Sequence, residues 1–169
     1  RNSSQDAISN AVVQDNLVHD NGANGNGWGI VLSATGFTAS GNVARDNGNG
    51  MYFSDTDAGA VQGRAFGNLA YGNGTGFWFD RSALYEDNEA HDNATGATMS
   101  LTSGGTVARL NAWRNTTGVS ITGAPSATQT LRDSHVVGNG TGVFVFARES
   151  TVTGNVVSDN DTGIWVSGS

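Results

Sequence analysis

Short segments that alternate apolar and polar residues recur along the chain and are separated by turns of Gly and Asn. One phrase, Asn-x-x-Gly-apolar-x-apolar, repeats at intervals of 20 to 26 residues. It begins at Asn47, Asn73, Asn93, Asn115, Asn139 and Asn160, and a seventh copy with a five-residue insertion begins at Asn21. Alternation with a period of two predicts short strands, and the recurring phrase predicts a repeat architecture.

A second polar position and a small apolar position accompany each repeat. The polar position lies five residues before the repeat asparagine and is itself asparagine at Asn16, Asn42, Asn68, Asn88 and Asn155. In the two remaining coils this position is occupied by Leu110 and by Ser134. Between the two polar positions stands a small residue, at Val18, Ala44, Ala70, Ala90, Ala112, Val136 and Val157. This constancy predicts a column of side chains that point inward.

The spacing of these features decides between repeat folds. Helices are disfavoured because the segments are short and β-branched and have no sustained helical period. A propeller blade needs about 40 residues per repeat, and a leucine-rich repeat would show its Leu pattern. Three short strands per coil therefore predict an all-β parallel solenoid of about seven coils and three parallel sheets, forming a single domain over residues 1–169. Its predicted core column is Phe53, Phe79, Met99, Ile121, Val145 and Val166.

The repeats between Ala11 and Val166 resemble the right-handed parallel β-helix repeat family, the solenoids of pectate-lyase-like proteins. The resemblance implies a right-handed coil, and an internal ladder formed by Asn16, Asn42, Asn68, Asn88 and Asn155 at a tight bend. It also implies that the ladder is interrupted at Leu110 and Ser134. The same repeat serves polysaccharide lyases, hydrolases, epimerases, a maturation protein for nitrous oxide reductase and surface proteins, so the fold alone does not decide the function.

Composition and charge narrow the functional classes. The chain has no Cys, which excludes a disulfide scaffold and a thiolate metal site. A formal charge of −7 argues against binding to nucleic acid or to an anionic membrane, and no segment is apolar enough to span a bilayer. We expect a secreted, periplasmic or cell-surface protein. Repeat sequence continues almost to Ser169 without a cap, so we also expect a longer solenoid, or end-to-end contact with further coils or copies.

Aromatic residues supply the strongest candidate binding surface. Strand alternation points Tyr52, Trp78, Phe144 and Trp165 outward in one row, and Asp80 in the next row. An aromatic strip beside polar groups is typical of a surface that binds a polysaccharide or a cell-surface glycan. The alternative is aromatic packing under a loop or against another chain, in a structural or adhesive surface module. A periplasmic metalloenzyme maturation factor is a third hypothesis, although the three histidines are not expected to converge.

Catalytic chemistry has fewer candidates. Lys is absent, so the acidic and basic group that could serve a polysaccharide lyase, hydrolase or epimerase reduces to Asp55, Asp80 and Arg81. The neighbouring pair His91 and Asp92 could act as a general base, but two polar side chains in contact with solvent are the simpler interpretation. The Asn-Thr-Asp and Gly-His-Gly signatures of polygalacturonases and the Asp-Pro-His signature of alginate epimerases are missing, which disfavours catalysis.

Two further motifs carry weaker predictions. The acidic runs at residues 55–57 and 159–161 have the composition of a calcium site, but solvated turn acids are the simpler reading, and we expect no other metal or cofactor. Acceptor sequences for N-glycosylation occur at Asn2, Asn73, Asn93, Asn115, Asn139 and Asn160. We interpret these asparagines as turn residues in the left-handed conformation, with the threonines two residues later stacked between coils.

Overall fold

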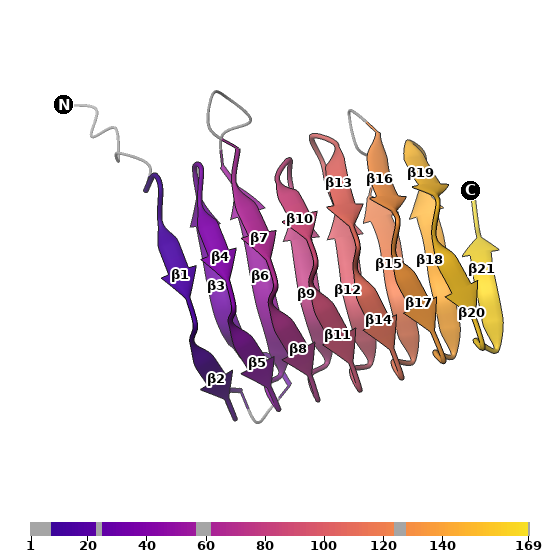
Figure 1. Cartoon of the computed structure of the whole chain (residues 1–169), viewed down its shortest axis with the longest axis horizontal. Coiled ribbons are helices and arrows are strands. Elements are labelled where there is room, and N and C mark those ends of the chain that lie inside the picture. Colours follow the sequence, from indigo (N-terminus) through magenta and orange to yellow (C-terminus); the bar gives the residue numbers. More distant parts are fainter. Residues whose placement is uncertain (1–7, 23–24, 57–61, 124–127, 169) are drawn as a thin grey trace.

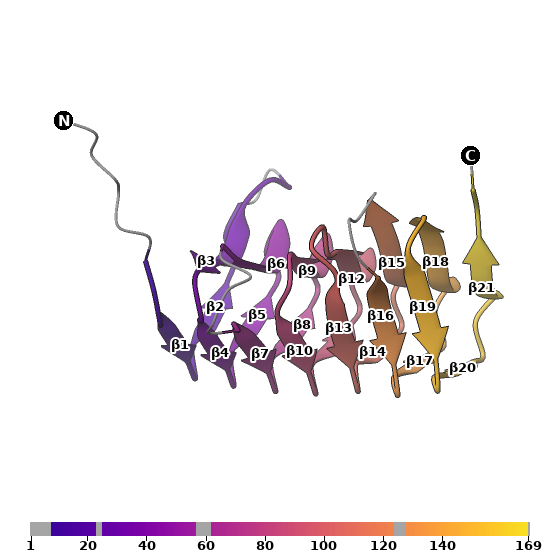
Figure 2. The same cartoon turned by 90° about the horizontal axis from the view of Figure 1, so that it is seen from above.

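The protein is a solenoid of parallel strands. The computed structural model describes residues 8–22, 25–56, 62–123 and 128–168, and this part of the chain forms 21 strands and no helix. The strands wind into seven coils that follow one another along a single axis (Figure 1). Each coil adds one strand to each of three sheets, and the sheets enclose the core between them (Figure 2).

The three sheets have the same organisation. Sheet 1 contains β1 (Val12–Gln14), β4 (Thr38–Ser40), β7 (Arg64–Phe66), β10 (Leu84–Glu86), β13 (Gly105–Ala108), β16 (Gln129–Arg132) and β19 (Ser150–Thr153). Sheet 2 contains β2 (Leu17–His19), β5 (Val43–Arg45), β8 (Leu69–Tyr71), β11 (Glu89–His91), β14 (Asn111–Trp113), β17 (His135–Val137) and β20 (Val156–Ser158). Sheet 3 contains β3 (Trp28–Ala34), β6 (Asn49–Asp55), β9 (Thr75–Asp80), β12 (Thr95–Ser100), β15 (Thr117–Gly123), β18 (Thr141–Ala147) and β21 (Thr162–Val166). The predicted all-β fold of seven coils and three parallel sheets is confirmed.

A tight bend joins sheet 1 to sheet 2, and the predicted asparagine ladder lies there. The Asn42 side chain accepts hydrogen bonds from the Asn16 backbone N–H and side-chain amide, at 3.1 and 2.9 Å, and the pattern continues through Asn68 to Asn88. Leu110 offers no side-chain acceptor, so the ladder is interrupted there as predicted. We call this row the first ladder.

The prediction of a second interruption at Ser134 was wrong. The Ser134 hydroxyl accepts a hydrogen bond from the Leu110 backbone N–H at 3.1 Å and donates one to the carbonyl of Arg132 at 2.9 Å. The Ser134 backbone N–H in turn donates to Asn155 Oδ1 at 2.9 Å. A serine hydroxyl is a donor and an acceptor at once, so it replaces the asparagine amide and the ladder resumes.

The bend between sheets 2 and 3 holds a second, unbroken ladder, formed by the asparagines that open the repeat phrase. Its members are Asn21, Asn47, Asn73, Asn93, Asn115, Asn139 and Asn160. In each coil the backbone N–H and Nδ2 donate to Oδ1 of the next asparagine, as Asn73 does to Asn93 at 2.9 and 3.1 Å. A Cβ atom added at Gly76 would lie 2.5 Å from the carbonyl oxygen of Gly96 and 3.0 Å from Asn93 Nδ2, both on the next coil. The repeat phrase therefore places a glycine three residues after each asparagine because the backbone carbonyl and the ladder amide of the next coil both pack against that position.

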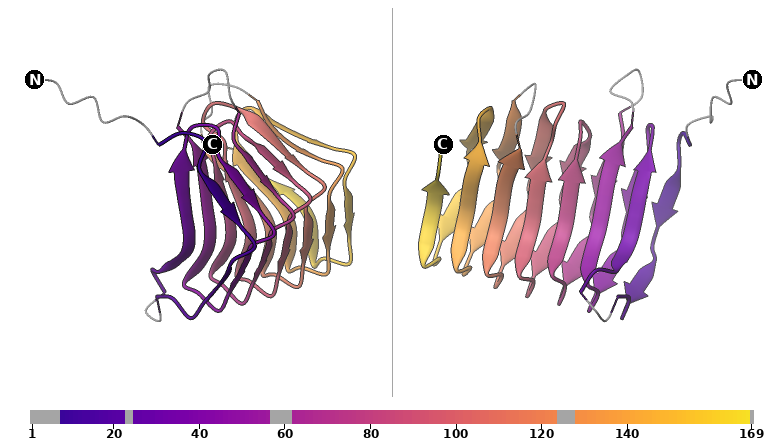
Figure 3. Two further views of the ribbon diagram at one scale, coloured as in Figure 1. Left: turned by 60° about the vertical axis from the view of Figure 1, so that its left-hand side comes forward. Right: turned by 180° about the vertical axis from the view of Figure 1, so that it is seen from behind.

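The interpretation of these asparagines as left-handed turn residues was wrong. The left-handed conformation falls one residue earlier, for example at Asp46, Gly72, Asp92 and Arg114. That residue turns the chain, and the asparagine after it points inward to satisfy the backbone of two neighbouring coils. Figure 3 shows the bends of successive coils following one another in rows along the axis.

The core is a stack of aromatic and aliphatic side chains. Phe53 and Phe79 lie on successive coils with ring centroids 6.5 Å apart, and Tyr85 stacks on Phe79 at 4.4 Å. Five members of the predicted core column are buried, namely Phe53, Phe79, Met99, Ile121 and Val145. Val166 is the exception at 72% exposure, because it lies in the last coil and has neighbours on one side only.

Ala90 shows how narrow the core is between the two ladders. It is fully buried and pairs with Ala70 and Ala112 on the adjacent coils. Ala90→Leu is expected to lower the free energy of unfolding by ~1–3 kcal/mol, because the larger side chain must displace packed neighbours. Thermal unfolding of this variant beside Asn111→Leu, on the outside of sheet 2, measures the effect. Equal melting temperatures for the two variants would contradict the inward assignment.

Candidate functional site

The outer face of sheet 3 brings the predicted binding residues together. Parallel pairing places its outward side chains in three rows that run along the solenoid axis. Row one is Trp28, Asn49, Thr75, Thr95, Thr117, Thr141 and Thr162. Row two is Val31, Tyr52, Trp78, Thr98, Ser120, Phe144 and Trp165. Row three contains Ser33, Ser54, Asp80 and Ser100, then Thr122 and Phe146.

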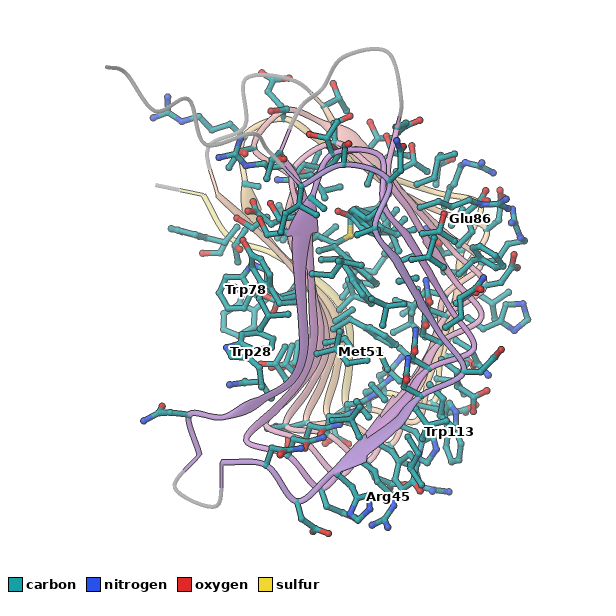
Figure 4. The ribbon with its side chains drawn as sticks, turned by 90° about the vertical axis from the view of Figure 1, so that its left-hand side faces the viewer. Trp28, Arg45, Met51, Trp78, Glu86 and Trp113 are labelled. Carbon is teal, nitrogen blue, oxygen red and sulfur yellow. The ribbon has the colours of Figure 1, made fainter. Side chains whose placement is uncertain are left out.

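Three aromatic rings form a cluster over the first coils of this face, which we call the first aromatic cluster. Tyr52 and Trp78 are paired neighbours, as predicted. Trp28 lies edge-on against both, with ring centroids 5.6 Å from Tyr52 and 6.3 Å from Trp78. Figure 4 shows Trp28 and Trp78 together outside the sheet and Met51 inside it. Trp78 was expected to be exposed, but it is half-buried because Trp28 packs against it.

The acidic group of the cluster is Asp80. Its Oδ2 accepts hydrogen bonds from the Tyr52 hydroxyl at 2.7 Å and from the Ser54 hydroxyl at 3.2 Å. Partial burial, and then the hydrogen bond to Asp80, raise the pKa of the Tyr52 hydroxyl above its usual value. The tyrosine therefore remains protonated at neutral pH and holds the carboxylate in place.

The other two candidates for catalysis do not share this position. Asp55 is only 2% exposed and accepts a hydrogen bond from the backbone N–H of Gly63, so its carboxylate faces the interior. Strand alternation from Phe53 already implies that direction. Arg81 follows the end of β9 in a left-handed conformation and is exposed. The structure therefore places Asp55, Asp80 and Arg81 in three different environments.

A second aromatic cluster lies toward the C-terminal end of the same face. Phe144 and Trp165 occupy successive coils, as predicted, and their rings meet edge to face at 5.3 Å. Phe146 lies parallel to Phe144 at 6.4 Å. Phe146 and Trp165 are 49% and 54% exposed. Together with Phe144, they border a shallow groove of about 550 Å³ whose other lining residues are Thr117, Thr141 and Ser167.

Sheet 2 carries an aromatic feature that the sequence did not reveal. Tyr71, His91 and Trp113 form a continuous ring stack, with centroids 5.0 and 4.3 Å apart. His91 Nδ1 lies 2.7 Å from Asp92 Oδ2. Hydrogen bonds from Arg114 and then from His91 hold the pKa of Asp92 well below its usual range. Stacking depends on side-chain rotamers, which strand alternation does not specify. His91 is held between two rings and Asp92 is bonded to His91 and Arg114, so the pair considered as a general base is already engaged.

The histidines and acids do not form a metal site in the described residues. His19 and His91 are three paired strands apart along sheet 2, and no group of three or more His, Asp or Glu side chains is placed to hold an ion in that part of the chain. Two acidic runs were considered as calcium sites. In the run at residues 55–57, Asp57 lies outside the described residues. The other run contains Asn160, which serves the second ladder.

Membership of the second ladder removes the sequon asparagines from solvent. Asn93, Asn115 and Asn139 are each 4% exposed, and each donates Nδ2 to backbone carbonyls. We expect no glycan at these three positions in a host that attaches N-glycans, as measured by intact mass spectrometry. The variant Val12→Thr, which creates an acceptor sequence at exposed Asn10, serves as a control for the host. Hexose additions on Asn93, Asn115 or Asn139 would contradict the ladder. The remaining acceptor, Asn2, lies outside the described residues.

The family model described as right-handed beta helix region matches residues 28–169. The chain belongs to this family. Searches among curated proteins and solved structures found no match. Membership confirms the predicted right-handed β-helix, a fold often associated with carbohydrates, and it agrees with the three parallel sheets and the buried ladders. The described part of this right-handed beta helix contains no helix suited to crossing a membrane.

Proposed function

We propose that this right-handed beta helix is an extracytoplasmic module that binds a polysaccharide or cell-surface glycan along the outer face of sheet 3. The observation that carries the proposal is the pair of aromatic clusters in register on one sheet face. Tyr52 and Trp78 belong to one cluster, and Phe144 and Trp165 to the other. Aromatic side chains gathered on an outer face in this way are typical of binding surfaces.

The chemistry of the face suits a sugar chain. Aromatic rings offer flat apolar surfaces to the C–H groups of a pyranose, and the electron-rich ring face favours such contacts. Asp80 and the hydroxyls of Ser120 and Thr117 lie beside the rings and can pair with sugar hydroxyls. Parallel strands repeat every ~4.8 Å along the axis, so an extended polymer lying along the axis meets a new side chain at each coil.

Binding is better supported than processing of the polysaccharide. Hydrolysis requires two carboxyl groups on one substrate at about 5 to 10 Å, and the face presents Asp80 while Asp55 points into the core. Asp80 is also engaged by Tyr52 and Ser54. A carboxylate held in this way suits recognition of a hydroxyl group.

A structural or adhesive module is the second candidate. The unbroken second ladder favours it, because seven equivalent coils tied by buried amides form a stiff rod. In that case the aromatic clusters would pack against another chain. In the first function the outer face of sheet 3 binds a glycan, and in the second it packs against another protein chain. The effect of a single substitution on that face on glycan binding therefore distinguishes the two functions.

The test is a glycan array probed with the wild type, Trp78→Ala and Trp113→Ala. Trp113 is also a half-buried tryptophan, but it lies on sheet 2 and controls for general effects on the fold. We expect Trp78→Ala to weaken binding about tenfold or more, as the loss of ~1.4 kcal/mol would, and Trp113→Ala to bind as the wild type does. Glycan binding that is the same in all three proteins, or absent from the wild type, would contradict the proposal.

A further inference from the structure

The outer face of sheet 3 is almost free of charge. Its three rows contain tryptophan, tyrosine, phenylalanine, valine, asparagine, serine and threonine, and one ionisable acid, Asp80. No Arg or His occupies an outward position on the described strands of this sheet. The chain has no Lys. A ligand lying on the face therefore meets rings and hydroxyl groups.

The basic side chains of the described residues lie elsewhere. Five arginines are on sheets 1 and 2 or on their bends, and each is paired with a carboxylate, namely Arg45, Arg64, Arg109, Arg114 and Arg132. Arg81 and Arg148 follow the last residues of β9 and β18, so they lie at the edge of the face beside row three and belong to none of the rows. The overall charge of −7 repels a polyanion in addition.

Binding of an acidic polysaccharide needs basic groups that contact its carboxylates or sulfates. Arginine and lysine supply these contacts through charge-assisted hydrogen bonds. Without them, transfer of each acidic group from water to a surface of rings and hydroxyls is unfavourable. A neutral sugar has no such cost, since its hydroxyls exchange water for serine, threonine and Asp80 partners.

The distance between the two aromatic clusters sets the size of the ligand. Trp78 and Phe144 are separated by three strand spacings, through Thr98 and Ser120, which is ~14 Å. The half-buried hydroxyl residues Thr95, Thr117 and Ser120 line the interval. A ligand that contacts both clusters must therefore be an extended oligosaccharide of several units that follows the solenoid axis.

We infer that the outer face of sheet 3 is selective for a neutral polysaccharide, one chain of which lies along the solenoid axis and contacts both aromatic clusters. This inference rests on the proposed function and specifies its substrate class. The single acid, Asp80, adds selectivity against polyuronates and sulfated glycans. The middle of the polysaccharide lies on the hydroxyl-lined surface between the two aromatic clusters.

The experiment is a titration of the whole protein with defined oligosaccharides. The neutral probes are the tri- and hexasaccharides of cellulose, xylan, mannan and laminarin, and the acidic probes are hexagalacturonate and a heparin hexasaccharide, each at low and at high salt. We expect at least one neutral hexasaccharide to bind with an affinity independent of salt, because no ion pair contributes, and to bind tenfold or more tightly than its trisaccharide. We expect the acidic hexasaccharides to bind at least tenfold more weakly than that neutral hexasaccharide.

Variants in each cluster test whether one ligand contacts both. Trp78→Ala and Trp165→Ala are each expected to lower the affinity for the neutral hexasaccharide tenfold or more. Trp113→Ala is the control, and its affinity should equal that of the wild type. Preference for an acidic probe, or affinity that falls with salt, overturns the neutral class while the proposed function stands. Equal affinity for tri- and hexasaccharides, or sensitivity to one cluster only, overturns contact with both. If the array and the titrations show no binding of any glycan, the proposed function itself fails.

Discussion

Replacement of Asn93 by alanine is expected to lower the free energy of unfolding by about 3 to 5 kcal/mol. Asn93 is 4% exposed, and its Oδ1 accepts hydrogen bonds from the Asn73 backbone N–H and side-chain amide. Its Nδ2 donates to the carbonyl of Ala70 at 3.0 Å. Alanine leaves these buried groups without partners, and each unpaired group costs about 1 to 3 kcal/mol. Urea unfolding followed by circular dichroism measures the change.

Asn111→Ala is the matched control for this experiment. Asn111 has the same side chain, but it is exposed on the outside of sheet 2, so its loss should change stability by no more than about 0.5 kcal/mol. Similar midpoints for the two variants would show that water replaces the amide at Asn93, and that the second ladder contributes little. The slopes should agree, since neither substitution alters the surface exposed on unfolding.

Phe79→Ala is expected to be comparably destabilising, at ~3–5 kcal/mol, through loss of packing and the cavity it leaves. Phe79 is fully buried and stacks with Phe53, Phe77 and Tyr85. Trp78→Ala, one residue away, should cost only ~1–2 kcal/mol, because its ring is half-buried and loses mainly the contact with Trp28.

The two variants are to be compared by thermal and urea unfolding under the same conditions. Their difference, rather than either value, tests the inward and outward assignment along β9. If Trp78→Ala destabilises the protein as much as Phe79→Ala does, the tryptophan is part of the packed structure, and a loss of glycan binding in that variant would reflect damage to the fold.

Much of the fold could be predicted because the repeat constrains every coil in the same way. The small column around Ala90 and the register of Tyr52 with Trp78 both follow from alternation and the spacing of the repeat. The second ladder could not be predicted by the same reasoning. Asparagine favours left-handed turns and also satisfies buried backbone groups, and the sequence alone does not say which role applies. The preceding residues, such as Asp92 and Gly72, carried the missing signal.

The candidate site was predicted in part, and each omission has a physical reason. The insertion after Asn21 hides the register of Trp28, so its contact with Tyr52 and Trp78 became visible only in three dimensions. Asp55 is the exception, because alternation from Phe53 already places it on the inward side of β6 and was sufficient to predict its burial. Ring stacking at His91 depends on rotamers, and the repeat carries no information about them.

The molecule is modular because the asparagines of the second ladder occupy equivalent positions in successive coils. Each asparagine of the second ladder meets the same donors and acceptors as the next, so a whole coil can be excised between equivalent positions without a new type of junction. Removal of residues 93–114 would join Asp92 to Asn115, reproducing the present junction of Asp92 with Asn93. The same excision would remove Leu110 and bring Asn88 next to Ser134, which would leave a shorter protein whose first ladder has no interruption.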